Sequence, residues 1–194
     1  MVVTPTVRLC ARVLVGACAF LLNSCLWVSQ APLLQPSADF VPPFAPGHYA
    51  LTFIDPDGAH DAGRPAEISA GKGGALLLHL DYPGDFSIVG VPLAAPGRQL
   101  WLAQILPVGP NAPSQTAYFY ALIERHSDKF LVDTMDCDRN QALAIRSGGS
   151  VTSGGGLDVK LCQFADRAAL ERGATAYAAE HPDLMPDYIL STAR

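Results

Sequence analysis

Short apolar segments separated by glycine and proline turns are the feature that most constrains the fold of this chain. Gly47–Ile54 alternates apolar and polar residues, and Ala75–Asp81 places three leucines on one face of an extended segment. A period of two residues indicates half-buried β-strands. Further strands are expected at Ala66–Ala70, Phe86–Val91 and Gln99–Leu106. Strands this short, joined by turns, predict an antiparallel sheet that forms a small barrel or sandwich.

The middle of the chain adds a hairpin and a short helix. Strands at Thr116–Arg125 and Lys129–Met135 flank a polar turn, which is the pattern of a β-hairpin. We expect a short helix at Arg139–Ile145 with Asp138 as its N-cap. Leu157–Leu161 is predicted to be the last strand.

A second helix is predicted at Arg167–Glu180, with Asp166 as its N-cap and Pro182 after its end. Its apolar residues recur at helical spacing and form one stripe that can pack on the sheet: Leu170, Gly173, Ala174, Tyr177 and Ala178. The apolar residues of the tail that follows predict a turn tucked against the domain. The fold class expected overall is α+β and mainly β, with this C-terminal helix packed on the barrel or sandwich.

The N-terminal segment has the layout of an export signal. Arg8 and Arg12 precede the uncharged apolar run Val13–Leu22, which is too short to span a bilayer comfortably. Leu22–Cys25 then matches a bacterial lipobox, so Cys25 is the predicted site of lipid attachment. Ordinary cleavage after Ala31, or an uncleaved anchor, are the alternatives.

These features divide the chain into three parts. Residues 1–25 form the signal peptide, and residues 26–46 contain five prolines that predict an extended tether between membrane and domain. Residues 47–194 form the β-rich globular domain.

Five cysteines are present, and two of them, Cys10 and Cys18, lie in the signal segment. With Cys25 assigned to lipid, Cys137 and Cys162 remain. Two cysteines in an exported domain predict one disulfide bond.

The charge of the chain bears on its partners. Residues 26–194 keep 11 basic and all 18 acidic residues, because only Arg8 and Arg12 precede them, and their formal charge is −7. This acidic balance disfavours a nucleic-acid partner and electrostatic attraction to an anionic membrane. Contact with a membrane is therefore expected through the N-terminal lipid.

The layout resembles a group of uncharacterised small lipoproteins of Gram-negative bacteria. Besides the lipobox, the matching pieces are Gly47–Tyr49, Tyr118–Leu122, Asp136–Asp138, and Cys162 followed by a closing helix. The resemblance covers about three quarters of the chain and implies no activity.

Three clusters of polar residues are candidates for functional sites. Asp55, Asp57 and Asp61 alternate, but they depart from a calcium-loop pattern and indicate a solvated turn. His79 and Asp81 share a strand face, where a structural hydrogen bond is expected. Glu124, Arg125, His126 and Asp128 are interpreted as a charged hairpin tip. No catalytic residue, metal site or cofactor is predicted.

The function expected first is that of a lipid-anchored envelope protein with a non-enzymatic structural or protein-binding role. It would face the periplasm, and Leu26 after the lipidated cysteine favours the outer membrane. The first alternative is a small-ligand-binding barrel with a cavity lined by Leu76, Leu78, Trp101 and Tyr120. The second alternative is a periplasmic hydrolase that uses His79 or His126.

Overall fold

The structure is a computed structural model, and it describes residues 26–35, 40, 42–54, 63–81, 84–110, 112, 117–153 and 160–193. Cys25 and the alternating aspartates Asp55, Asp57 and Asp61 lie outside the described residues. The described part is mainly β and carries two α-helices, as predicted.

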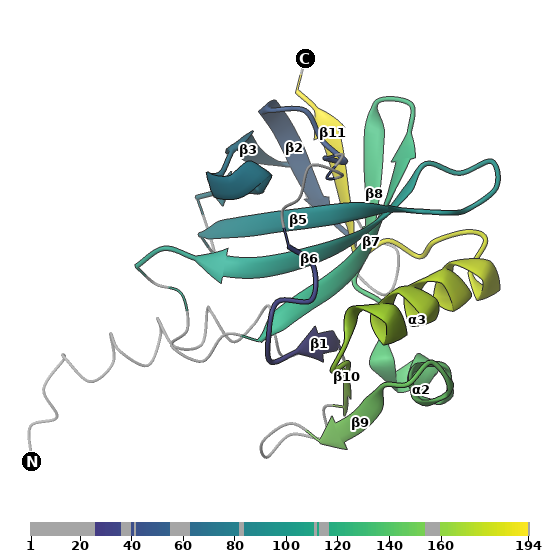
Figure 1. Cartoon of the computed structure of the whole chain (residues 1–194). Coiled ribbons are helices and arrows are strands. Elements are labelled where there is room, and N and C mark those ends of the chain that lie inside the picture. Colours follow the sequence, from purple (N-terminus) through teal and green to yellow (C-terminus); the bar gives the residue numbers. More distant parts are fainter. Residues whose placement is uncertain are drawn as a thin grey trace, which may run out of the picture.

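Eight strands close into an antiparallel barrel (Figure 1). The first seven follow one another around the ring, and the eighth comes from the C-terminal tail and closes it. In order around the barrel they are β2 (Gly47–Phe53), β3 (Arg64–Ala70), β4 (Leu76–Leu80), β5 (Asp85–Leu93), β6 (Leu100–Val108), β7 (Tyr118–His126), β8 (Lys129–Asp133) and β11 (Tyr188–Thr192). A single 3₁₀ turn, η1 (Lys72–Gly74), joins β3 to β4.

Alternate residues of each strand point into the barrel, as the period of two predicts. The inward side chains form one buried cluster, which includes Leu76, Leu78 and Leu80 of β4 and their neighbours Ile88 and Ile123. The predicted strands and the central hairpin are confirmed, and the barrel is the architecture adopted.

Strands β5, β6 and β7 have a second apolar face, which lies outside the barrel. Val89, Leu102 and Leu122 belong to this face, and they are buried in a second core. Because both faces are covered, these strands consist of nearly continuous apolar residues.

An outer layer covers that second face. It consists of β1 (Trp27–Ser29), α2 (Cys137–Arg146), β9 (Ser150–Ser153), β10 (Lys160–Gln163) and α3 (Arg167–Glu180). Strand β1 pairs with β7 on one side and with β10 on the other, and β10 pairs with β9. The two helices lie together beside this extension (Figure 1).

Helix α3 has the predicted bounds, its N-cap Asp166 accepts a hydrogen bond from the Ala169 amide, and its predicted apolar stripe is buried. Helix α2 begins earlier than predicted. Its N-cap is Asp136, which accepts from the amide of Asp138, so Asp138 lies inside the first turn. The prediction of Asp138 as the cap was wrong, because Asp136 was the carboxylate better placed for that turn.

The N-terminal part of the predicted 26–46 tether is packed on the domain. Trp27 is completely buried, and Leu34 is almost so. The side-chain oxygen of Gln104 accepts hydrogen bonds from the amides of Leu33 and Leu34, at 2.9 and 3.0 Å. The five prolines did not prevent strand pairing because all of them follow Trp27–Ser29 in the sequence. Among the described residues, no helix has the length and apolar character needed to cross a membrane.

The C-terminal tail is also more ordered than predicted. The strand expected at Leu157–Leu161 lies partly outside the described residues, which resume at Lys160. Strand β10 runs from Lys160 to Gln163 and is not the last strand, because the tail itself forms β11. Strand β11 lies between β8 and β2, with Leu190 opposite Phe130 and Leu51. Its pairing partners are distant in sequence, so no local pattern identified them.

The predicted disulfide bond is present. It joins Cys137, at the start of α2, to Cys162 of β10, and both residues are completely buried. Their Cα atoms lie 5.5 Å apart, which is an ordinary separation for a disulfide. The bond joins α2 to β10, the strand that pairs with β1.

Removing this bond should destabilise the outer layer. Replacing both Cys137 and Cys162 with alanine is expected to lower the free energy of unfolding by about 2–5 kcal/mol, the usual range for small exported domains. Urea denaturation of oxidised wild type and of the double variant measures the change. Equal midpoints for the two proteins would contradict the structural role given to the disulfide.

Gly173 on α3 tests the packing of Trp27 against the helix. A Cβ atom at this position would lie 2.8 Å from the Trp27 ring. Gly173→Ala should gain about 1 kcal/mol of helix propensity but lose about 1–3 kcal/mol through overpacking, so we expect a net loss of stability. Thr175→Ala, at an exposed position of the same helix, is the control. A stabilised Gly173→Ala protein in urea denaturation would refute the close contact.

Candidate functional site

One end of the barrel interior is filled by aromatic side chains. Phe44, from the segment before β2, packs edge-on against Phe130 with ring centres 4.8 Å apart, and Tyr49 lies next to both rings. Trp101 and Leu76 belong to the same buried cluster. These bulky groups close this end of the barrel.

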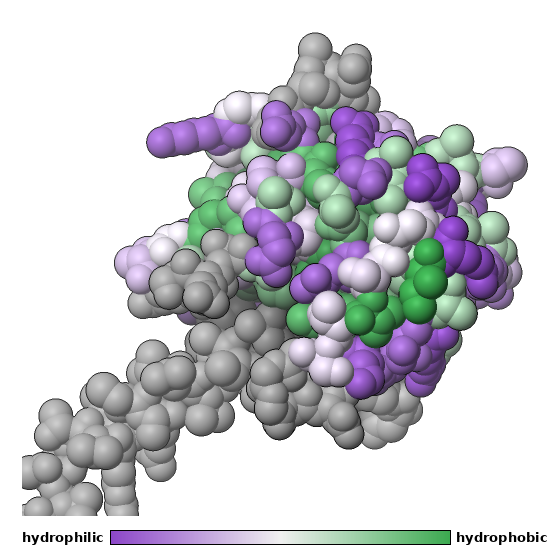
Figure 2. All heavy atoms as spheres, turned by 60° about the horizontal axis from the view of Figure 1, so that its bottom comes forward, coloured by the Kyte–Doolittle hydropathy of each residue, from purple (hydrophilic) through white to green (hydrophobic). Residues whose placement is uncertain are grey.

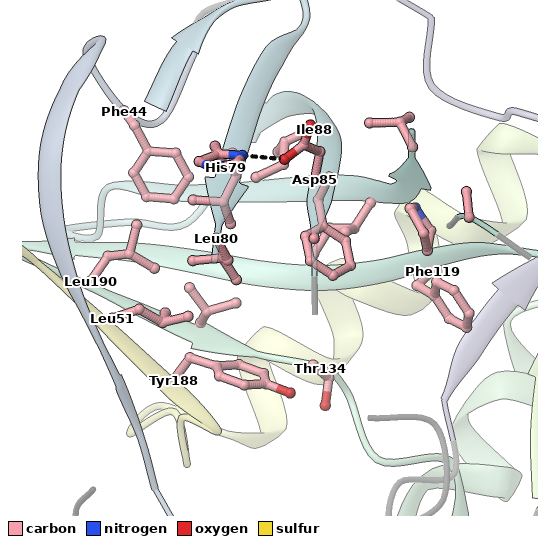
Figure 3. A pocket seen from close by; sticks show the side chains of 18 of the residues that line it. Phe44, Leu51, His79, Leu80, Asp85, Ile88, Phe119, Thr134, Tyr188 and Leu190 are labelled. Carbon is pink, nitrogen blue, oxygen red and sulfur yellow. Dashed lines mark hydrogen bonds and ion pairs between the residues drawn. The ribbon is translucent and has the colours of Figure 1, made fainter. Parts of the chain in front are cut away.

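The rest of the interior is an open cavity of about 400 Å³ (Figure 3). Its walls are mostly apolar side chains from strands all around the barrel. They include Leu51, Leu78, Leu80, Ile88, Ile105, Ile123, Val132 and Leu190, with Phe44 among the lining residues from the closed end. A cavity of this size and character is typical of small-ligand sites.

The cavity lies toward the end of the barrel where β4 ends and β5 begins, and on one side of this end β7 and β8 part. Strand β8 ends at Asp133, while the first residues of β7 pair instead with β1, Val28 lying opposite Phe119. Leu26, Phe119 and Thr134 line the cavity in this region. This side of the cavity is therefore built partly by the N-terminal segment that was predicted to be a tether.

Two acidic residues and one histidine stand at the rim. The ring nitrogen Nδ1 of His79, on β4, contacts a carboxylate oxygen of Asp85, on β5 (Figure 3). The side chain of His79 is 56% exposed, so the pair is open to solvent. The hydrogen bond with Asp85 and the charge of that carboxylate raise the pKa of His79 above its ordinary value, and Asp81 adds to the effect.

The rim differs from the sequence prediction in one respect. Asp81 was the expected neighbour of His79, but the hydrogen-bonded partner is Asp85, which faces His79 across the β4–β5 turn. Among the described residues that line the cavity, the charged side chains are His79, Asp81 and Asp85, and none is lysine or arginine. The rim is therefore acidic whenever His79 is neutral.

Two of the four predicted cavity residues line the cavity, Leu78 and Tyr120. Leu76 and Trp101 do not, because they point into the barrel nearer its closed end. The Tyr120 hydroxyl lies in the outer core, 2.6 Å from the Ser29 hydroxyl. The alternation along the strands identified the inward leucines. The sequence contained no signal for how far the aromatic side chains fill the barrel and where the cavity begins.

One residue of the predicted charged hairpin tip, Glu124, forms a partly buried ion pair with Arg98. Glu124 is buried and receives two hydrogen bonds from the guanidinium of Arg98, at 2.9 and 2.6 Å. Arg98 also donates to the Ala178 carbonyl at the end of α3. His126 is exposed and lies 3.3 Å from Glu124. This cluster fastens the helix to the barrel, and it is not part of the cavity lining.

Leu26, Asp85, Phe119 and Tyr188 line the cavity but were not predicted to do so. Asp85 begins a strand directly after a Pro-Gly turn, and its position opposite His79 across that turn was the one available signal. No group of three or more His, Cys, Asp or Glu side chains in the described parts of the chain is arranged to hold a metal ion.

Most apolar surface is covered elsewhere on the molecule. On the face seen in Figure 2, apolar side chains lie among hydrophilic ones. Ile145 and Met185 are the large apolar side chains that stay exposed within the described ranges, and neither lines the cavity. Among the described residues, the cavity is thus the concave apolar site in which a ligand could be held.

Comparisons of the chain with protein-family models, with curated proteins and with solved structures find no match. Function is therefore inferred from the cavity and its rim.

Proposed function

We propose that this protein is a non-enzymatic binding protein whose barrel holds one uncharged, elongated apolar molecule, such as an acyl chain. The observation that supports this most strongly is the apolar cavity of about 400 Å³ that opens at one end of the barrel. It favours the ligand-binding alternative over the structural or protein-binding role that the sequence put first.

The energetics agree with an apolar ligand. Each methylene group moved from water into an apolar cavity contributes about 0.8 kcal/mol, so ten of them contribute about 8 kcal/mol before the cost of immobilising the ligand. A cavity at the lower end of the usual range of roughly 300–1,000 Å³ accommodates a single chain rather than several.

The rim favours a neutral polar end on the ligand. Asp81 and Asp85 are the acids that line the cavity among the described residues, and His79 is the one neighbouring group that can carry a positive charge. A carboxylate or phosphate at this position would meet like charge without a permanent cation. An ester, alcohol or ether end avoids that repulsion.

The location that we propose is the cell envelope, with the protein exported, lipid-anchored at Cys25 and facing the periplasm, more specifically at the outer membrane. The signal-like N-terminus and the lipobox support this proposal, and so does the resemblance to small lipoproteins. The Cys137–Cys162 disulfide is consistent with it, because such bonds persist in oxidising compartments.

The His79–Asp85 pair favours a second candidate function, hydrolysis with His79 as general base. A histidine oriented by a carboxylate at a cavity mouth can activate a water molecule. Among the described lining residues, however, no serine or cysteine is present as a nucleophile, and the Thr134 hydroxyl donates to Asp187. Ligand binding therefore remains the first proposal.

Binding of an uncharged probe tests the first proposal. The chain from residue 26 onward should enhance the fluorescence of N-phenyl-1-naphthylamine, because the probe is apolar and neutral. Leu78→Trp, which fills the cavity, should weaken binding by roughly ten-fold or more, whereas Leu77→Trp, on the outward face of the same strand, should not. A long-chain alcohol should displace the probe about five-fold better than the carboxylate of equal length.

His79→Ala separates the two candidate functions. Probe binding should survive this change, because His79 lies at the rim rather than in the apolar wall. If both leucine variants bind equally well, the cavity is not the site. If His79→Ala abolishes the protein's function in cells while the protein stays folded and binds the probe, hydrolysis takes first place.

Lipid attachment is tested on the mature protein. Mass spectrometry should find an acylated Cys25 at the N-terminus, because the lipobox places the cleavage site directly before that residue. A mature protein that begins at Pro32, after Ala31, would instead indicate ordinary secretion.

A further inference from the structure

We infer that the cavity holds an acyl chain carried by Cys25 of the same molecule. This inference rests on the proposed function and names the source of the ligand. It follows from where the described chain begins, how firmly that point is held, and the charge of the rim.

The described chain begins at the cavity lining. Leu26 is buried and lines the cavity, as does Phe119 of the neighbouring strand β7. Residue 25 is joined to it by one peptide bond, and consecutive Cα atoms lie only about 3.8 Å apart. A lipid group on Cys25 would therefore be attached one residue away from the cavity lining.

The attachment point is held in place by the outer layer. The Leu26 carbonyl accepts a hydrogen bond from the Cys162 amide at 3.0 Å, and the Val28 carbonyl accepts one from the Phe164 amide at the same distance. Trp27 between them is completely buried, with its ring 4.7 Å from that of Phe164. Residue 26 cannot move away from the cavity without uncovering the tryptophan.

The chemistry of the rim matches the lipid of a lipoprotein. A diacylglyceryl group is joined to the cysteine sulfur through a thioether and carries no charge. The charged or titratable side chains of the described lining are Asp81, Asp85 and His79, with no lysine or arginine, so while His79 is neutral the lining disfavours the phosphate of phospholipids and the carboxylate of fatty acids.

Covalent attachment also favours this source over a free ligand. A group tethered by a short linker has an effective concentration in the millimolar range. A free apolar molecule of similar affinity must reach that concentration to compete. Since the bilayer interior and the cavity are both apolar, a chain can exchange between them, and the other acyl chains of the same lipid group remain in the membrane.

Photocrosslinking in intact membranes tests the inference. Cells that express the full chain are grown with a fatty acid that carries a terminal diazirine, irradiated, and analysed by peptide mapping. We expect the peptide that begins at Cys25 to be joined through its acyl chain to cavity peptides that contain Leu51 or Leu190. Leu78→Trp should lose these joined peptides, and Leu77→Trp should retain them.

The other outcomes distinguish this inference from the proposed function. Cavity peptides joined only to bilayer phospholipid would overturn the inference and leave apolar ligand binding intact. A lipidated Cys25 whose chains react only with the bilayer would also overturn it, and so would a Cys25 without lipid. Absence of any crosslink to the cavity, together with failure to bind N-phenyl-1-naphthylamine, would overturn both.

Discussion

Burial of Trp27 is the interaction on which the rest of the structure depends. The ring lies against Phe164, Tyr177 and the bare backbone of Gly173, so β1, β10 and α3 meet around one side chain. That contact keeps β1 on the edge of β7 that β8 has left. Leu26, which precedes Trp27, lines the cavity at the place where β7 passes from pairing with β8 to pairing with β1. One buried side chain in the outer layer thus holds in place the segment that lines this side of the cavity.

The outer layer and the barrel are also joined by a buried carboxylate. Asp133, the last residue of β8, accepts hydrogen bonds from the Met135 amide and from the hydroxyl of Tyr177 on α3. Burial raises the pKa of Asp133 to about 6, although these two hydrogen bonds oppose the shift. Because the folded protein holds this proton more tightly than the unfolded chain, ionisation of Asp133 opposes folding as the pH rises through about 6. The hydrogen bond from Tyr177 to this carboxylate links α3 to the end of β8.

The barrel separates a structural half from a binding half. Aromatic side chains fill the closed end, and the open half is lined mainly by aliphatic side chains, with Phe86, Phe119 and Tyr188 among them, and leaves room for a ligand. The cavity lining combines an acidic rim with Leu26, the first of the described residues. A binding site at the point where a lipid anchor would be attached connects the proposed function with the proposed location in the envelope.

Local patterns in the sequence determined the strands, the closing helix with its Asp166 cap, and the single disulfide, because alternation, capping and cysteine number depend on neighbouring residues. The same alternation identified Leu78 as a cavity residue. Only the tertiary structure decided that Tyr188–Thr192 closes the barrel, that Trp27–Ser29 belongs to the domain, and that Asp85 pairs with His79. Each of these features depends on a partner that is distant in sequence or lies across a turn. Which residues become partners is set by the register of the strands in the closed barrel. The position of the cavity along the barrel also depends on the combined size of the inward side chains that different strands place at the same height. The sequence of one strand does not contain that information.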